Sequence, residues 1–266
     1  VVTISVILSK LSALPKLCHS PSENAESLSP LLPQRLYVIL EYLFWSAIYM
    51  VLPPRFFLIL IIIIVIVIGS VILHELSHGL VAYLLGDRTA KDAGRLSLNP
   101  IKHIDPYMSI LVPVILYLLR APVFGAAKPV PVNYANLKWR EWGMALTAVA
   151  GPLTNFLLAF VSFLIGHFTG FIYGTSGELL EFVFSELVLI NLGFMIFNLI
   201  PIPPLDGSRV LYAIAPDSVR NIMTNIERYG IIIIYVMILL FGEVFSGIMS
   251  GGVNGILNFF YWIVGM

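Results

Sequence analysis

The sequence contains a single cysteine, Cys18, and few charged side chains, which make up 11% of its 266 residues. One cysteine excludes an intrachain disulfide and a metal cluster held by cysteines, and the polar stretch around Cys18 argues against a catalytic thiol. The charged fraction is less than half of the roughly 25% that is usual in soluble domains, which excludes an ordinary soluble domain. The formal net charge is zero, so nothing favours nucleic acid as a partner.

Apolar residues dominate what is present. Hydrophobic side chains make up 59% of the chain and its mean hydropathy is +0.94, values typical of a polytopic membrane protein. Residues 15–34 are rich in serine and proline, so we expect a flexible N-terminal lead-in over 1–35. A transmembrane domain is expected over 36–266, with its core at 56–215.

The distribution of apolar runs predicts an all-α polytopic membrane protein with about six transmembrane helices. One further run, Tyr107–Leu119, is interrupted by Pro113, and its helical rise of about 20 Å is shorter than the roughly 30 Å hydrocarbon core. We therefore expect this segment to be re-entrant or interfacial. The predicted spans are Leu36–Leu52, Phe56–Leu85, Trp142–Ile165, Leu179–Ile200, Tyr229–Phe245 and Val253–Val264.

A HExxH motif, His74-Glu75-Leu76-Ser77-His78, lies inside one of the most apolar runs. On a helix the two histidines are one turn apart, so both imidazoles can hold one zinc ion, and Glu75 can accept a proton from water. Ionisable groups at this depth cost roughly 2.5–3.5 kcal/mol each on insertion scales, which favours a function. A structural zinc site or a proton relay in a transporter would also explain the motif.

A third metal ligand is expected from Asp206, which follows a proline-rich stretch at 201–204 that cannot continue a regular helix. Irregular backbone at membrane depth occurs where it is buried in protein or lines a wet cavity. The alternative is a plain loop with an Asp-Gly turn. Asp206 returns to the side of His74 and His78 only if Tyr107–Leu119 does not cross the membrane.

Basic residues after the HExxH helix predict the orientation of the chain. Arg88, Lys91, Arg95 and Lys102 follow this helix, which places that side in the cytoplasm. His78 lies about 12 Å of helical rise before Gly86. The metal site is therefore expected within the membrane, nearer the cytoplasmic face.

Four stretches together resemble the site-2 protease family of intramembrane zinc metalloproteases. They are HELSH at 74–78, NPIKHIDP at 99–106, AGPLTN at 150–155 and FNLIPIPPLDG at 197–207. The resemblance implies that His74, His78 and Asp206 bind Zn²⁺ and that Glu75 is the catalytic base. Asn155 is similar to the family's asparagine near the active site and could donate to an oxyanion, although a helix–helix hydrogen bond is the ordinary role of a membrane asparagine.

The resemblance also implies the substrates and the location. It is closest to the compact bacterial and archaeal type without PDZ or CBS domains, which implies a prokaryotic cell membrane and transmembrane protein substrates. The segment Phe124–Leu137 disfavours helix and is expected to be an extended loop, either an edge for an unwound substrate or a simple connection. The alternative functions are a transporter, which would need internal repeats that the sequence lacks, and an inactive protease-like binding protein.

Overall fold

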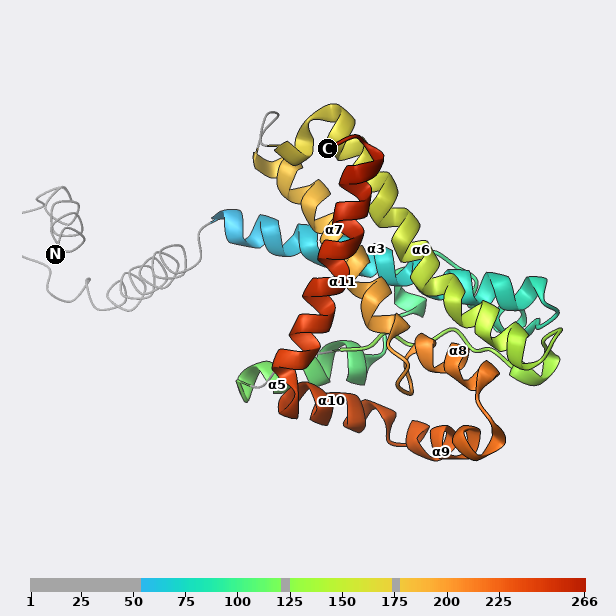
Figure 1. Cartoon of the computed structure of the whole chain (residues 1–266). Coiled ribbons are helices and arrows are strands. Elements are labelled where there is room, and N and C mark those ends of the chain that lie inside the picture. Colours follow the sequence, from blue (N-terminus) through green and yellow to red (C-terminus); the bar gives the residue numbers. More distant parts are fainter. Residues whose placement is uncertain (1–53, 121–124, 174–177) are drawn as a thin grey trace, which may run out of the picture. The chain divides into compact units, whose positions relative to one another are not determined.

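Helices form nearly all of the regular structure in residues 54–120, 125–173 and 178–266, which are the residues that the computed structural model describes (Figure 1). No strand occurs within these ranges, so the predicted all-α class is confirmed. The predicted lead-in at 1–35, the predicted span Leu36–Leu52 and Phe124 lie outside the described residues.

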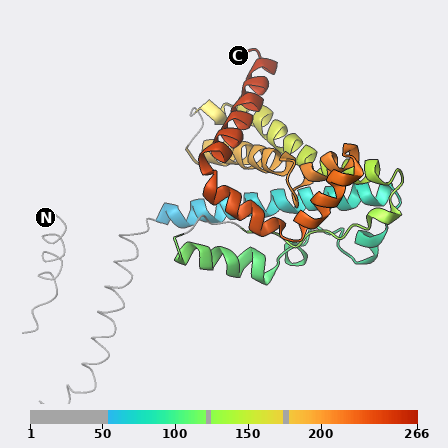
Figure 2. The same cartoon turned by 60° about the horizontal axis from the view of Figure 1, so that its bottom comes forward.

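Three helices are long and apolar enough to cross a membrane: α3 (Pro54–Leu84), α6 (Glu141–Thr169) and α7 (Glu178–Leu199). Two shorter helices, α9 (Asp217–Glu227) and α10 (Gly230–Leu240), follow each other with a bend of 86° (Figure 2). The number rises to four if this bent pair is counted as one broken span. The predicted number of about six is therefore not confirmed within the described residues.

The C-terminal helices differ from the prediction. The sequence predicted a break between spans at Tyr229–Phe245 and Val253–Val264, but α10 ends at Leu240 and α11 runs without interruption over Gly242–Ile263. A Cβ atom at Gly252 would lie 2.9 Å from the side chain of Ile196 on α7. Close packing of α11 on α7 thus outweighs the low helix propensity of the glycines.

The short apolar segment at 106–118 forms two short helices of different kinds. A π-helical stretch, η2 (Pro106–Leu111), leads into α5 (Val112–Leu118). The carboxylate of Asp105 accepts hydrogen bonds from the N–H groups of Tyr107 and Met108, both at 2.9 Å, and so begins the helix. Its length agrees with a segment that does not cross the bilayer.

Two apolar clusters hold the helices around the centre of the molecule. One joins α6, α7 and α11 and contains Ala159, Phe163, Val188, Leu192 and Phe260. The other packs Ala82 of α3 against Leu137 and Met144. The helices that carry the motifs are therefore packed side by side through these clusters.

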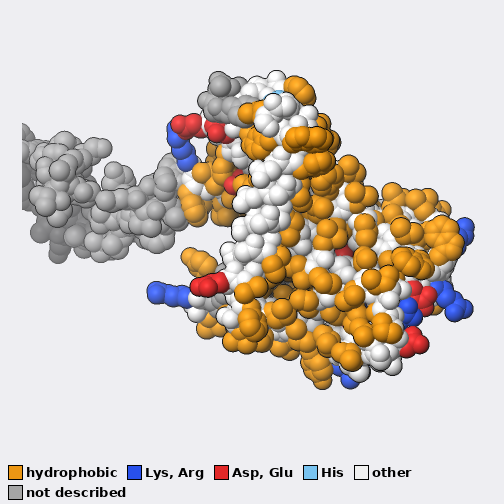
Figure 3. Space-filling view, in the orientation of Figure 1, with side chains coloured by type: hydrophobic (Ala, Val, Ile, Leu, Met, Phe, Trp, Pro, Cys, Tyr) orange, Lys and Arg blue, Asp and Glu red, His pale blue; other side chains and the backbone are white. Residues whose placement is uncertain are grey.

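The surface of the described residues is largely apolar. Hydrophobic side chains cover most of the face in Figure 3, while charged side chains lie at its edges. Large apolar side chains on the long helices are exposed, for example Val65 and Leu157. An apolar surface of this extent is typical of contact with lipid, so the chain is a membrane protein.

The remaining elements are short. They are α4 (Thr89–Asp92), η1 (Pro100–Lys102), η3 (Tyr134–Asn136), η4 (Phe171–Tyr173) and α8 (Asp206–Ile214).

Candidate metal centre

The two histidines of the HExxH motif and Asp206 meet at one point. His74 and His78 are one turn apart on α3, and their Nε2 atoms are 3.0 Å apart. Asp206, the first residue of α8, places its Oδ2 atom 3.2 Å from Nε2 of His74 and 3.3 Å from Nε2 of His78. The structure therefore brings together the three residues predicted as metal ligands.

The proline-rich stretch carries Asp206 back to α3. Helix α7 ends at Leu199, and the next residues form tight turns in which Ile202 N–H donates to the carbonyl of Ile200. A Cβ atom at Gly207 would lie only 2.2 Å from the carbonyl oxygen of Leu199. The Asp-Gly pair is thus needed because only glycine lets the start of α8 approach the end of α7.

Hydrogen bonds on the far side of each ring orient the imidazoles. His78 Nδ1 donates to the carbonyl of Thr147 at 2.7 Å, and His74 Nδ1 donates to Oδ1 of Asn155 at 2.5 Å. A carbonyl oxygen can only accept, so the hydrogen of each neutral ring is on Nδ1. Each Nε2 is left with a free lone pair directed at Asp206, as in a metal-binding histidine.

The three converging atoms are all acceptors, and this favours a cation between them. Oδ2 of Asp206 is buried and has no hydrogen-bond partner. Lone pairs brought this close repel one another unless a positive ion shares them. Two imidazole nitrogens and one carboxylate oxygen are the donors that zinc prefers in sites with an open position. The donor set therefore fits Zn²⁺, with His74, His78 and Asp206 as its protein ligands.

Gly151 is a site residue that sequence reasoning missed. A Cβ atom there would lie 2.4 Å from Nε2 of His78 and 2.5 Å from Nε2 of His74, so α6 can pass the imidazoles only through a glycine. The signal was present, because Gly151 precedes a proline inside an apolar helix in the AGPLTN stretch. A glycine in a helix interior often marks such a close approach.

Asn155 lies at the site, fully buried, and links it to α7. Its Oδ1 atom accepts from His74, while its Nδ2 atom donates to Oδ1 of Asn191 at 2.8 Å. Asn191 in turn donates to the carbonyl of Leu187. The structure shows Asn155 orienting His74 and bonding a neighbouring helix, and the predicted donation to a substrate oxyanion stays a prediction.

Glu75 is held by the extended segment, by which we mean residues 125–133. Oε2 of Glu75 accepts a hydrogen bond of 2.8 Å from the backbone N–H of Val130. A Cβ atom at Gly79 would lie 2.8 Å from Cγ1 of Val130, so this glycine admits the segment against α3. The predicted loop near the active site is thus confirmed over 125–133, which form no helix, whereas Tyr134–Asn136 of the same stretch form the 3-10 helix η3.

Asp87, three residues after the end of α3, is a second residue that sequence reasoning missed. Its buried carboxylate accepts hydrogen bonds from Thr89 (N–H and hydroxyl), from Asn133 N–H at 2.7 Å and from Asn136 Nδ2 at 3.0 Å. We call these four residues the Asp87 clasp. Burial raises the pKa of the Asp87 carboxyl, but these hydrogen bonds outweigh burial and hold the pKa below its ordinary value.

Comparison with known proteins agrees with this site. Residues 173–242 match the model of "Peptidase family M50". The chain is 39% identical over 197 residues to "Putative zinc metalloprotease YwhC" of Bacillus subtilis, an alignment that covers 72% of this chain and 87% of that protein. No solved structure matches the chain.

Two further relatives are also described as putative zinc metalloproteases. MJ0611 of Methanocaldococcus jannaschii is 34% identical over 159 residues, which cover 59% of this chain and 73% of that protein. Rip2 of Mycolicibacterium smegmatis is 26% identical over 171 residues, which cover 64% of this chain and 63% of that protein. With the HExxH helix and the Asp-Gly turn placed as described, the chain belongs to peptidase family M50, the site-2 protease family that its motifs resemble.

Proposed function

We propose that this chain is an intramembrane zinc metalloprotease that hydrolyses peptide bonds within or near transmembrane segments of membrane proteins. The observation that carries the proposal is the convergence of three unshared acceptor atoms, from His74, His78 and Asp206, beside Glu75 on a strongly apolar helix. Membership of a peptidase family supports the reaction class, and the apolar surface supports the membrane.

The metal and the residues around it have separate roles in hydrolysis. Zn²⁺ bound at this site would polarise the substrate carbonyl and lower the pKa of a water molecule toward about 7. Glu75 accepts a proton as the water oxygen bonds to the peptide carbonyl carbon, and returns it to the amine as the C–N bond breaks. Asn155 and Thr147 keep the imidazoles oriented, and Val130 N–H keeps the Glu75 carboxylate in place.

A substrate helix must unwind before it reaches the site, because its peptide bonds are hydrogen-bonded within the helix. The extended segment offers a partner for the unwound chain. Pro129 and Pro131 have no N–H, so the segment lacks backbone donors at these two positions. In an extended chain Val132 points its N–H to the same edge as Val130, which faces Glu75. We infer that the substrate pairs along this edge.

We infer that the protein lies in a prokaryotic cell membrane with its active site nearer the cytoplasmic face. Basic residues after α3, namely Arg88, Lys91 and Lys102, favour a cytoplasmic position for the C-terminal end of α3. His78 lies about two turns inside that end.

Metal content and cleavage test the proposal together. Purified protein should hold about one zinc ion per chain and cleave a synthetic single-span polypeptide in detergent. Replacing His74 and His78 together by alanine should remove both the zinc and the cleavage. His167→Ala, near the far end of α6, is the control and should keep both. Full zinc retention in the double variant would contradict the ligand assignment.

A further inference from the structure

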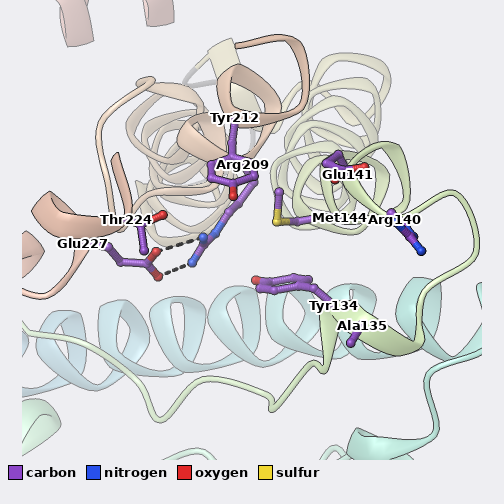
Figure 4. A pocket seen from close by; sticks show the side chains of 9 residues that line it. All are labelled: Tyr134, Ala135, Arg140, Glu141, Met144, Arg209, Tyr212, Thr224 and Glu227. Carbon is purple, nitrogen blue, oxygen red and sulfur yellow. Dashed lines mark hydrogen bonds and ion pairs between the residues drawn. The ribbon is translucent and has the colours of Figure 1, made fainter. Parts of the chain in front are cut away.

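A cavity of about 460 Å³ lies between the start of α6, the pair α8–α9 and η3 (Figure 4). In this view Tyr134 lies below the guanidinium of Arg209, and the Met144 side chain reaches toward the space between them. Its volume falls within the range of ligand pockets. The lining residues are Tyr134, Ala135, Arg140, Glu141, Met144, Arg209, Tyr212, Thr224 and Glu227.

The cavity lies close to the metal ligands along two helices. Arg209 follows Asp206 by three residues on α8, a rise of about 5 Å. Met144 precedes Gly151 by seven residues on α6, which is about 10 Å and two turns, so both face the same way. An extended chain advances about 3.3 Å per residue. The cavity is therefore about two or three substrate residues away from the scissile bond.

The cavity lies toward the C-terminal end of α3, which Asp87 follows. Met144 packs with Ala82, which is one turn beyond His78 on α3, and with Leu137. Tyr134 follows directly after the extended segment. A substrate strand paired with that segment would thus pass the metal centre and reach the cavity on its predicted cytoplasmic side.

The charges that line the cavity cancel. Arg209 forms two hydrogen bonds with the carboxylate of Glu227, which ties α8 to α9. Its guanidinium also lies 5.2 Å from the ring centre of Tyr134. Arg140 and Glu141 add one charge of each sign. Because the charges that line the cavity sum to zero, it does not favour a phosphate or a charged side chain.

Apolar faces remain for an occupant. Met144 is buried, and its flexible thioether adapts to partners of different shape. Tyr134 and Tyr212 also line the cavity, and each adds an apolar ring with a polar tip. The paired Arg209 and Glu227 fix the opposite wall. These walls suit a large uncharged side chain.

We propose that this cavity is a substrate subsite for a large uncharged side chain, aromatic or long aliphatic, on the cytoplasmic side of the scissile bond. The inference rests on the proposed proteolytic function and names the substrate feature that the protein selects. Met144 and Tyr134 are then specificity-determining residues.

A positional scan tests the subsite. The cleavage site of a Leu/Ala single-span polypeptide is first located by mass spectrometry, and phenylalanine then replaces alanine at each of its next four cytoplasmic positions. We expect kcat/KM to rise by about tenfold or more at the second or third position only. In Met144→Trp the ratio of kcat/KM for phenylalanine to kcat/KM for alanine at that position should fall close to one, because the indole fills the cavity. Leu146→Trp, on the exposed side of α6, is the matched control and should keep the preference.

A cross-link gives a readout that needs no cleavage. Thr224→Cys is combined with Cys18→Ser and Glu75→Gln, and the polypeptide carries one cysteine at each position in turn. A disulfide should form at the second or third position and not at the first. The subsite would be overturned if phenylalanine changed kcat/KM equally at all positions, or if Met144→Trp kept the wild-type preference. Either result would leave the proposed proteolytic function standing. No cleavage of any polypeptide by zinc-loaded protein would overturn the proposed function, and the cross-link pattern would then decide on the cavity alone.

Discussion

At the scale of single residues, the metal centre depends on which nitrogen of each histidine carries the hydrogen. The carbonyl groups of Thr147 and Asn155 hold that hydrogen on Nδ1 of His78 and His74. Each buried acceptor left without a partner costs about 1–3 kcal/mol. The three acceptors therefore make the folded chain less stable without a cation, and metal binding contributes to folding stability.

Glu75 and Asp206 should respond differently to neutralisation. Glu75→Gln should keep the zinc but lose about 10²–10⁴-fold in cleavage rate, because an amide cannot accept the proton. Asp206→Asn should lower the zinc content itself, because a neutral amide is a poorer ligand than a carboxylate. Bound zinc and cleavage of a single-span polypeptide are measured for both variants side by side. Cleavage by Glu75→Gln at the wild-type rate would rule out the general-base role.

Gly151→Ala should damage the metal centre although it changes no ligand. Its Cβ atom would lie about a full ångström too close to both imidazoles, so the rings or α6 must shift and the ligand geometry changes. We expect the zinc content to fall well below one per chain, with the α-helical circular dichroism retained. Gly193→Ala on α7 is the control, since a Cβ atom there meets nothing within 4 Å. Equal zinc in the two variants would mean that the imidazoles tolerate the shift.

At the scale of elements, the extended segment is held on both sides of Val130. Before Val130, Arg95 Nη2 donates to the carbonyls of Lys128 and Pro129, at 2.8 and 3.2 Å. After it, the Asp87 clasp holds Asn133 and, beyond the segment, Asn136. The contact of Val130 with Glu75 is therefore set by the register of the whole segment.

Asp87→Asn should disturb this segment and leave the metal ligands in place. An asparagine offers one acceptor oxygen and directs an NH₂ group at donors that the carboxylate had accepted. We expect a loss of about 1–3 kcal/mol in stability and a lower kcat at unchanged zinc content. Thermal unfolding, metal analysis and kinetics check this, with the exposed Asp92→Asn as control. A wild-type kcat in Asp87→Asn would show that the clasp does not position Glu75.

The pH dependence of the clasp follows from its lowered pKa. A carboxyl whose pKa is lower in the folded state stabilises the fold above its unfolded pKa, near 3.8. This contribution is lost as the pH falls through the folded value. The stability difference between wild type and Asp87→Asn should thus be constant near neutral pH and shrink below about pH 4.

At the scale of the whole molecule, the loop between α3 and α6 returns to the side from which it leaves. Lys138 N–H donates to the carbonyl of Leu85 at 2.8 Å, and Asn133 and Asn136 bond to Asp87. The end of α3 and the start of α6 therefore lie at the same end of the bundle. This arrangement agrees with a segment Tyr107–Leu119 that does not cross the membrane, which is the condition for Asp206 to lie on the side of the histidines.

Cysteine labelling tests the orientation. In a Cys18→Ser background, Lys91→Cys and Lys138→Cys should react with a membrane-impermeant thiol reagent from the same side, and inverted vesicles should identify that side as cytoplasmic. Phe168→Cys, exposed near the far end of α6, is the control and should react from the opposite side only. Labelling of Lys91→Cys and Lys138→Cys from different sides would contradict the placement of the loop.

The sequence by itself determined the helical class, the apolar character of the chain and the placement of His74 and His78 on one helix face. These follow from local rules, namely apolar run length and the one-turn spacing of the two histidines. Asp206 follows prolines that end a helix, but the residues alone left a plain Asp-Gly turn equally open, and the resemblance to the family favoured a ligand. The sequence did not show that α11 continues through its glycines, because that depends on the contact of Gly252 with Ile196. The number of spans predicted from run lengths is likewise not confirmed by the described helices.

Only the tertiary structure decided how the site is held together. Gly151, Asp87 and the N–H of Val130 act on residues that lie far from them in the sequence, so no local pattern states their partners. Asn155 shows the same limit, since its type and place on a helix were compatible with two roles, and only packing showed that it bonds both His74 and Asn191. Ligand identity is thus a property of residue type and spacing, whereas orientation depends on contacts that arise when the helices pack.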